Sequence, residues 1–170
     1  MLGQDIALLL KLSLQSIGRP LSKDIAIEIF VSPSEISKSL HRCKSAGLLY
    51  WSDLEKRVNR TALLEFLVHG LKYVFPAELG PLTRGIPTVA AAPPLKSYFA
   101  ADPEPPPVWP YAEGTVRGYT FVPLYKHAAQ AALRDRKLYE LLALCDAVRG
   151  GRARERALAI EHLTSRLSHV

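Results

Sequence analysis

The sequence of 170 residues lacks most of the features that mark enzymes and metal proteins. It contains no Gly-rich phosphate loop of the GxxxxGK[ST] or GxGxxG type and no GxSxG nucleophile motif. The five histidines are scattered, with no helical pair and no cysteine at metal-ligand spacing. General acid–base catalysis prefers acidic residues that are paired in apolar surroundings. The acidic residues of this sequence are instead dispersed. We therefore predict that the protein is not an enzyme and holds no metal or cofactor.

Cysteines and long apolar runs are also scarce. The two cysteines, Cys43 and Cys145, each lie on the apolar side of an expected helix, so we interpret them as buried thiols in a reducing cytoplasm rather than as a disulfide. No apolar run approaches the roughly 20 residues of a membrane span, and no charged leader with an apolar core opens the chain. Nearly half of the residues are hydrophobic, which excludes wholesale disorder. We expect a soluble, cytoplasmic protein without a membrane partner.

Residues 21–49 predict two short helices joined by a tight turn. The second helix, about 33–46, has a sharp start, because Ser32 is a good N-cap, Pro33 suits the first helical position and Glu35 completes a capping box. Gly47 is its expected C-terminal stop. Apolar side chains recur along one side at helical spacing, and polar or basic ones occupy the other. The polar side carries Ser34, Lys38, His41, Arg42 and Ser45.

The segment before this helix favours a steep crossing of two helices. Residues 22–30 also begin with a capping residue and carry a narrow apolar stripe. Helices this short, with only a residue or two between them, cross as in a helix-turn-helix. Residues 5–17 predict a preceding helix with an apolar surface broad enough to cover both, ended by Gly18, Arg19 and Pro20.

Two short runs around Tyr50 and Val58 predict a β-hairpin after the helix pair, with Asp53, Leu54 and Glu55 between them. Its tip lacks the usual Gly or Asn, so a small or irregular hairpin is expected. A further helix should follow at about 61–73. This order of helices and hairpin resembles the winged helix-turn-helix transcription regulators of the MarR-like kind, over roughly residues 1–75.

The basic residues of the second helix have two interpretations. Lys38, Arg42 and Lys44 could form a solvated helix face, which is the common use of such charges. Within a helix-turn-helix, however, the start of the second helix meets base edges, so we predict contact with DNA. His41 is expected to be a neutral hydrogen-bonding group, with a pH-sensitive contact as the alternative. We assign Ser34, Lys38 and His41 to base or groove contact, Ser45 to the same surface, and Arg42, Lys56, Arg57 and Arg60 to phosphates.

The middle of the chain is rich in proline. Eleven of the thirteen prolines lie between Pro76 and Pro123. This density disfavours helix and removes hydrogen-bond donors from strands, so it predicts an extended or irregular connection. Many large apolar side chains in the region indicate an ordered strap across the helices, most exposed at 102–107. A Pro-rich ligand for a partner's aromatic groove is the alternative.

From Pro123 the pattern is helical again. Helices are expected from about 124 or 126 to 133, at 135–148 and at 152–168, the last two forming a hairpin. The resemblance implies a homodimer built partly from these helices and from the first helix. The segment RGGRARERA is either a solvated helix start or an anion pocket or second DNA contact. Its basic residues are Arg149, Arg152, Arg154 and Arg156.

The predicted fold class is mainly α with a small β-hairpin wing. We expect a winged helix-turn-helix DNA-binding domain at 1–75, a Pro-rich ordered strap or linker at 76–123 and a C-terminal helical segment for dimerisation at 124–170. The formal charge of +6 favours an anionic partner. The predicted function is a sequence-specific regulator of transcription that binds double-stranded DNA as a homodimer, by default a repressor. The alternative is a protein-interaction module, such as an antitoxin or accessory subunit with a protein partner from the same small operon.

Overall fold

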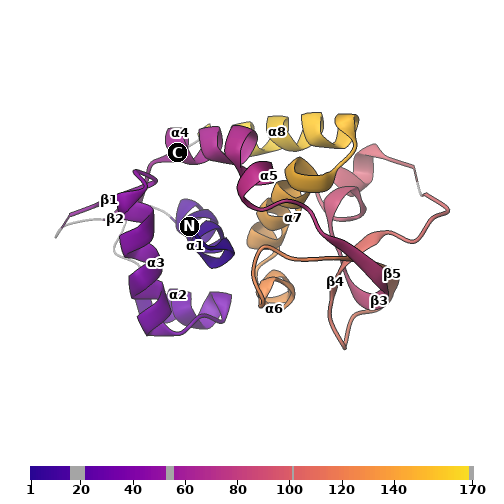
Figure 1. The fold of residues 1–170 in the computed structure, drawn as a ribbon, viewed down its shortest axis with the longest axis horizontal. Helices are drawn as coiled ribbons and strands as arrows, with labels where there is room; N and C mark the ends of the chain where they lie inside the picture. Colours follow the sequence, from indigo (N-terminus) through magenta and orange to yellow (C-terminus); the bar gives the residue numbers. More distant parts are fainter. Residues whose placement is uncertain (16–21, 53–55, 101, 169–170) are drawn as a thin grey trace.

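The computed structural model describes residues 1–15, 22–52, 56–100 and 102–168. The protein is mostly helical, with one antiparallel pair of strands and one group of three strands. Helix α3 and the strand pair lie at one end of the molecule, the three strands lie at the other, and α1 and α7 run between them (Figure 1). The elements in chain order are α1 (Gly3–Ser13), α2 (Ser22–Ile29), α3 (Pro33–Ser45), β1 (Leu49–Trp51), β2 (Lys56–Val58), α4 (Arg60–Glu65), the π-helical turn η1 (Phe66–Gly70), α5 (Leu71–Val74), β3 (Leu79–Pro87), the 3-10 turns η2 (Val89–Ala91) and η3 (Leu95–Tyr98), β4 (Pro107–Pro110), β5 (Val116–Phe121), α6 (Ala128–Arg134), α7 (Arg136–Gly150) and α8 (Ala153–Ser168).

Helix α1 is the centre of the fold because it is apolar on most of its circumference. Every residue from Asp5 to Ser13 is buried, and the helix contacts α2, α3, β2 and α7. The helix ends at Ser13, earlier than predicted; Ile17 and the expected stop at 18–20 lie outside the described residues. Because α1 is enclosed by its own chain, it cannot supply the dimer surface that was predicted for it.

The start of α3 follows the sequence prediction in part. The hydroxyl of Ser32 accepts a hydrogen bond from the Glu35 N–H at 3.3 Å, with Pro33 in the first helical position. The reciprocal half of the predicted capping box is replaced, because the Glu35 carboxylate accepts from Lys38 at 2.8 Å and from Gln4 at 3.1 Å. Glu35 therefore also ties α3 to the start of α1.

Helices α2 and α3 end in the same backbone motif with different residues. The Val31 N–H donates to the Ala26 carbonyl with Phe30 at φ 56°, and the Leu48 N–H donates to the Cys43 carbonyl with Gly47 at φ 72°. Both are Schellman ends, whose left-handed residue is usually glycine. A side chain there costs about 1–2 kcal/mol. Phe30 regains about 0.5–1 kcal/mol from the Arg134 guanidinium, 4.8 Å from its ring centre.

The predicted hairpin is present as the antiparallel pair β1 and β2. Leu49 is opposite Val58, Tyr50 is opposite Arg57 and Trp51 is opposite Lys56. The residues of the turn, 53–55, lie outside the described part of the chain. Leu49 and Val58 are buried against the core, which fixes the register, because a slip by one residue would turn them outward.

The Pro-rich middle contains regular strands, which the sequence analysis did not predict. β3 pairs antiparallel with both β4 and β5, and β4 pairs parallel with β5, so the three strands close on themselves. The prolines occupy positions that need no donor: Pro81 lies at a register shift, Pro87 and Pro110 end strands and Pro107 begins one. Proline thus occurs at the strand ends and at the irregular position of β3, where no ladder donor is needed.

Close backbone contact in this three-stranded group depends on glycine. A side chain at Gly85 would collide with the Trp109 carbonyl, and one at Gly118 would collide with the Pro106 carbonyl. The group packs inward through Trp109 and Phe121, which are almost fully buried. Other apolar side chains of the region, Leu79, Leu82, Tyr98 and Tyr119, are exposed, so only part of the predicted set is packed.

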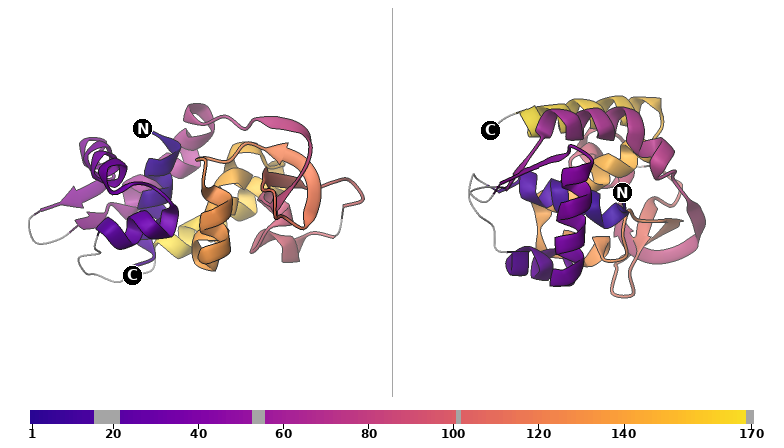
Figure 2. Two further views of the ribbon diagram at one scale, coloured as in Figure 1. Left: turned by 90° about the horizontal axis from the view of Figure 1, so that it is seen from below. Right: turned by 60° about the vertical axis from the view of Figure 1, so that its left-hand side comes forward.

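The C-terminal helices lie near their predicted positions and complete the core. The Asp135 carboxylate caps α7 by accepting from the N–H groups of Lys137 and Leu138. Helix α8 lies alongside α4 (Figure 2). A single cluster of buried side chains runs through α1, α3, the three-stranded group and α7, so the segments 1–75, 76–123 and 124–170 share one hydrophobic core. None of the helices in the described ranges has the length and apolarity to cross a membrane.

Candidate nucleic-acid interface

The outward face of α3 carries most of the polar residues predicted for it. Ser34, Lys38, His41 and Ser45 are all exposed, because Ile36, Leu40 and Cys43 turn the opposite side into the core. Lys38 is 65% exposed, although its ammonium donates to Glu35. Lys44 lies two turns further along and is also exposed. The face therefore offers hydroxyls, an imidazole and two ammonium groups.

Trp51 connects this helix face to the strand pair. Its ring centre is 4.8 Å from the His41 ring, and the ammonium groups of Lys44 and Lys56 lie 5.6 Å and 4.8 Å from it. Cations near an indole face are attracted by its quadrupole. Trp51 was not among the residues predicted for the site. The register that places Trp51 opposite Lys56 was the signal that could have found it.

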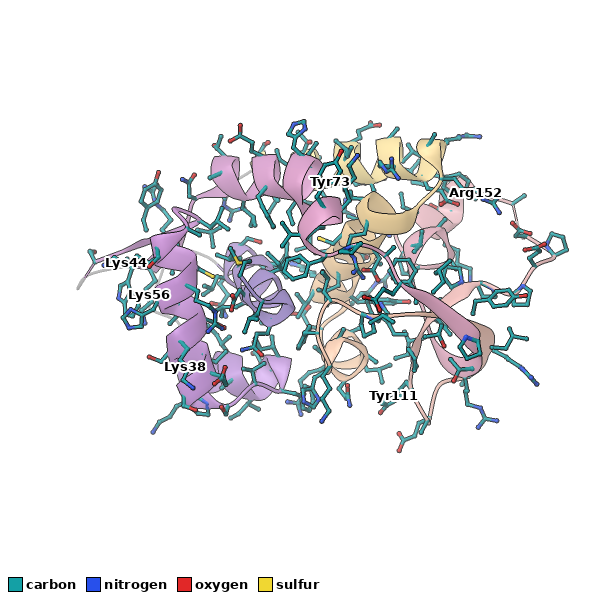
Figure 3. All side chains as sticks on the ribbon, viewed as in Figure 1. Lys38, Lys44, Lys56, Tyr73, Tyr111 and Arg152 are labelled. Carbon is teal, nitrogen blue, oxygen red and sulfur yellow. The ribbon has the colours of Figure 1, made fainter. Side chains whose placement is uncertain are left out.

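The second strand adds another cation, on the face of the strand pair that points away from Leu49 and Val58. The Arg57 guanidinium lies 5.3 Å from the ring centre of Tyr50, which is exposed. Lys38, Lys44 and Lys56 lie together at one end of the molecule, whereas Arg152 lies at the other (Figure 3). Helix and strands thus present cations, hydroxyls and aromatic rings at the end of the molecule that α3 and the strand pair form. We call it the α3–β2 surface, defined by Ser34, Lys38, His41, Lys44, Ser45, Tyr50, Trp51, Lys56 and Arg57.

Arg42 does not belong to this surface, contrary to its predicted role as a phosphate ligand. Its Nε and Nη2 donate to the two oxygens of the fully buried Asp5 carboxylate at 2.8 and 2.7 Å. Ser39 donates to the same carboxylate at 2.6 Å. A carboxylate that is buried away from water needs such partners, so the Arg42 side chain is held in an ion pair that joins α3 to α1.

The electrostatics of Asp5 follow from this arrangement. Burial alone would raise the pKa of the carboxyl, because it penalises the charged form. Hydrogen bonds from Arg42 and Ser39, with a further bond from the Leu2 N–H, outweigh burial and lower the pKa below its ordinary value. Asp5 is therefore an ionised acceptor at neutral pH.

Arg60 is also used within the fold rather than presented as a phosphate ligand. Its Nη2 donates to the Ser13 carbonyl at 2.7 Å, at the C-terminal end of α1. Helix ends leave carbonyls without partners, and a guanidinium is a common donor to them. The predicted phosphate role of Arg60 is therefore not supported by its position.

The four arginines of RGGRARERA do not form one anion pocket. Arg149 is buried and donates to Asp146 and to the carbonyls of Phe75 and Val122. The other three point to separate neighbours: Arg152 lies 3.5 Å from Asp102, Arg154 lies 5.5 Å from the ring centre of Phe99, and Arg156 donates to the Gly151 carbonyl. The buried Arg149 is therefore unsuited to the anion pocket or second DNA contact that was one of the two interpretations of this segment.

The remaining candidate chemistry is sparse in the described part of the chain. Cys43 and Cys145 are free and buried, as predicted, and burial raises the pKa of the Cys43 thiol to about 12, which makes it inert. Across residues 1–15, 22–52, 56–100 and 102–168, no three His, Cys, Asp or Glu side chains gather as metal ligands. The α3–β2 surface is thus the site with the clearest chemical character.

Comparison with known proteins adds no relative: no family model, no curated protein and no solved structure matches the chain.

Proposed function

We propose that the protein binds double-stranded DNA as a winged helix-turn-helix regulator of the MarR-like kind. In this proposal α2 and α3 are the helix-turn-helix, α3 enters the major groove, and β1 and β2 are the wing. The observation that carries the proposal is the α3–β2 surface, where the ammonium groups of Lys44 on a well-capped helix and of Lys56 on a neighbouring strand lie around the Trp51 ring. Repression by occupying a promoter is the simplest mechanism for such a surface.

The contacts of individual residues refine the assignment. Ser34, Lys38 and His41 lie toward the start and middle of α3, where a recognition helix meets base edges. Lys44 joins Lys56 and Arg57 as a proposed phosphate ligand, whereas Arg42 and Arg60 are left out because their guanidinium groups bind Asp5 and the Ser13 carbonyl. Most of the affinity should come from phosphates and should fall steeply with salt.

The homodimer belongs to the proposal with a different contact surface. Because α1 is enclosed, a second copy would have to approach through another face, such as the exposed side of α8. The DNA-binding unit is complete in one chain, and the stoichiometry of the complex with DNA reports the oligomeric state.

The test begins with selection of duplexes from a library with a randomised centre. Titration of the selected duplex is then followed by fluorescence anisotropy between about 50 and 200 mM salt, the range over which phosphate contacts weaken markedly. Lys38→Ala with Lys44→Ala should weaken binding and, through Lys44, reduce the salt dependence by about one phosphate contact. Neither lysine is buried, so the fold should be unchanged.

A matched control removes the same charge elsewhere. Lys72→Ala with Lys96→Ala also deletes two ammonium groups, outside the α3–β2 surface, and should leave affinity for the selected duplex close to that of the wild type. Failure to select any common sequence, or equal losses from the two double variants, would overturn the proposal.

A further inference from the structure

A second surface, distinct from α3–β2, exposes large apolar side chains beside cations. Ile27 on α2 and Leu133 on α6 are each 63% exposed, and Phe30 is 38% exposed. Arg134 joins these elements across 107 positions of sequence, because its Nη1 donates to the Ile27 carbonyl at 2.9 Å and its guanidinium covers the Phe30 ring. The His127 ring contacts Phe30 from the start of α6. We call this the α2–α6 surface.

The backbone of Phe30 provides an independent indication that this surface is used. The residue adopts a left-handed conformation at the end of α2, where the equivalent position of α3 holds Gly47. A glycine would satisfy the same turn without strain. Contacts with Arg134 and His127 hold the ring against α6, and 38% of Phe30 remains exposed. Strained residues of this kind cluster at binding sites.

The charges around these apolar side chains are mostly positive. Lys23 lies one helical turn before Ile27, Lys126 adjoins His127, and Arg134 and Arg136 follow Leu133. Arg136 remains 83% exposed despite a 3.5 Å approach to Glu140. The acids nearby are largely used: Glu28 and Asp135 both pair with Lys11, at 2.7 and 2.6 Å, which leaves Asp24.

We propose that the α2–α6 surface binds an acidic, amphipathic segment of a partner protein. Apolar side chains of the segment would cover Ile27, Phe30 and Leu133, and its carboxylates would meet Lys23, Lys126 and Arg134. A second copy placed by a two-fold axis would bring like charges together. A nucleic-acid backbone offers phosphates to the cations but nothing apolar to the two exposed aliphatic side chains. Three anchors make a small interface, so the complex is transient.

The probe is a labelled helical peptide with leucine along one face and glutamate elsewhere, and its counterpart has lysine in place of glutamate. The acidic peptide should bind the full chain, followed by anisotropy, and the basic peptide should not. Ile27→Ser with Leu133→Ser should weaken binding at least about tenfold, the usual scale for losing apolar anchors at an interface. The matched control, Leu79→Ser with Leu82→Ser, removes two exposed leucines from β3 and should bind as the wild type does.

Phe30→Gly separates binding from folding. This variant should unfold at the same or a higher urea concentration than the wild type, because glycine suits the turn, and yet bind the acidic peptide more weakly. Three results would overturn the proposal. The first is equal binding of both peptides, or no binding of the acidic one, and the second is equal losses in the two serine double variants. The third is loss of self-association or of duplex binding on Ile27→Ser with Leu133→Ser, which would assign the surface to a second copy or to DNA.

Discussion

Helix α3 with its strand pair and the junction of α7 with α8 are both rich in basic residues, yet their cations lie in different environments. On the α3–β2 surface, Lys38 and Lys44 project from a helix whose other side is core. At the junction, Arg149 is buried and its guanidinium meets a carboxylate and two carbonyls. The difference is whether the fold buries the cation among its acceptors, because the Lys38 ammonium donates to Glu35 and yet stays exposed. Local charge density therefore does not identify a binding site.

Each region also contains one arginine that pairs with a buried aspartate. Arg42 pairs with Asp5 and Arg149 pairs with Asp146, each through two nitrogens. Asp146 additionally accepts from Thr88 at 2.8 Å and from Trp109 at 2.6 Å. The first pair joins α3 to α1, whereas the second lies within α7, and its Asp146 joins that helix to Trp109 of the three-stranded group. Substitutions of the arginines paired with buried aspartates and of the exposed cations distinguish the two environments.

Arg149→Ala should give the largest loss of stability. Removing the guanidinium leaves the Asp146 carboxylate buried beside Thr88 and Trp109 without its counter-charge, which costs about 3–5 kcal/mol. Urea unfolding followed by circular dichroism measures the change. Because burial itself raises the pKa of Asp146, the double variant Arg149→Ala with Asp146→Asn should recover part of the loss. A loss of stability no larger than that caused by substituting an exposed arginine would contradict a structural role for Arg149.

Arg42→Ala should be the second largest. It strips the buried Asp5 carboxylate of two charged hydrogen bonds, but Arg42 is itself 30% exposed and Ser39 remains as a donor. We expect a loss of about 2 kcal/mol in the free energy of unfolding. Lys38→Ala, on the exposed face of the same helix, should cost almost nothing. Equal losses in the free energy of unfolding for the two variants would show that the Arg42–Asp5 pair does not stabilise the packing of α3 on α1.

The sequence was informative where local signals agree with the fold. The N-cap at Ser32, the stop at Gly47 and the cap at Asp135 are readable from residue type, and α3, α7 and α8 lie close to their predicted positions. The three-stranded group was missed because its strands pair across long stretches of sequence. β4 pairs both with β3, which precedes it, and with β5, which follows it. Only the folded chain shows that Pro87 and Pro107 fall at strand ends.

The candidate site was predictable to a similar degree. Helical spacing placed Ser34, Lys38 and His41 correctly on the exposed face. The same spacing assigned Arg42 to that face, since a long side chain at its edge can reach either outward or toward α1. Its partner Asp5 lies 37 positions earlier, inside a helix that was read as apolar. No local sequence pattern distinguishes an arginine that pairs with a buried carboxylate from an exposed one.

Acid should weaken the fold through Asp5. The pKa of Asp5 in the folded protein is lowered from the 3.8 of an unperturbed carboxyl. Its contribution is therefore fully present above about pH 4 and is lost as the pH falls through the folded pKa. The free energy of unfolding should decline in this acidic range for the wild type and less for Asp5→Asn. Parallel curves for the two proteins would exclude this origin of the acid sensitivity.

The smallest effect is expected from Arg152→Ala with Arg154→Ala. Both side chains are exposed, and their contacts with Asp102 and Phe99 lie at the protein surface, where ion pairs and cation–π contacts contribute little. Urea unfolding should match the wild type within error. This variant also removes two cations from the opposite end to the α3–β2 surface, so it should leave binding of the selected duplex unchanged, while Lys38→Ala with Lys44→Ala weakens it. Comparable losses of duplex binding would mean that DNA reaches both ends of the molecule, and the division between the two basic regions would then rest on Arg149 alone.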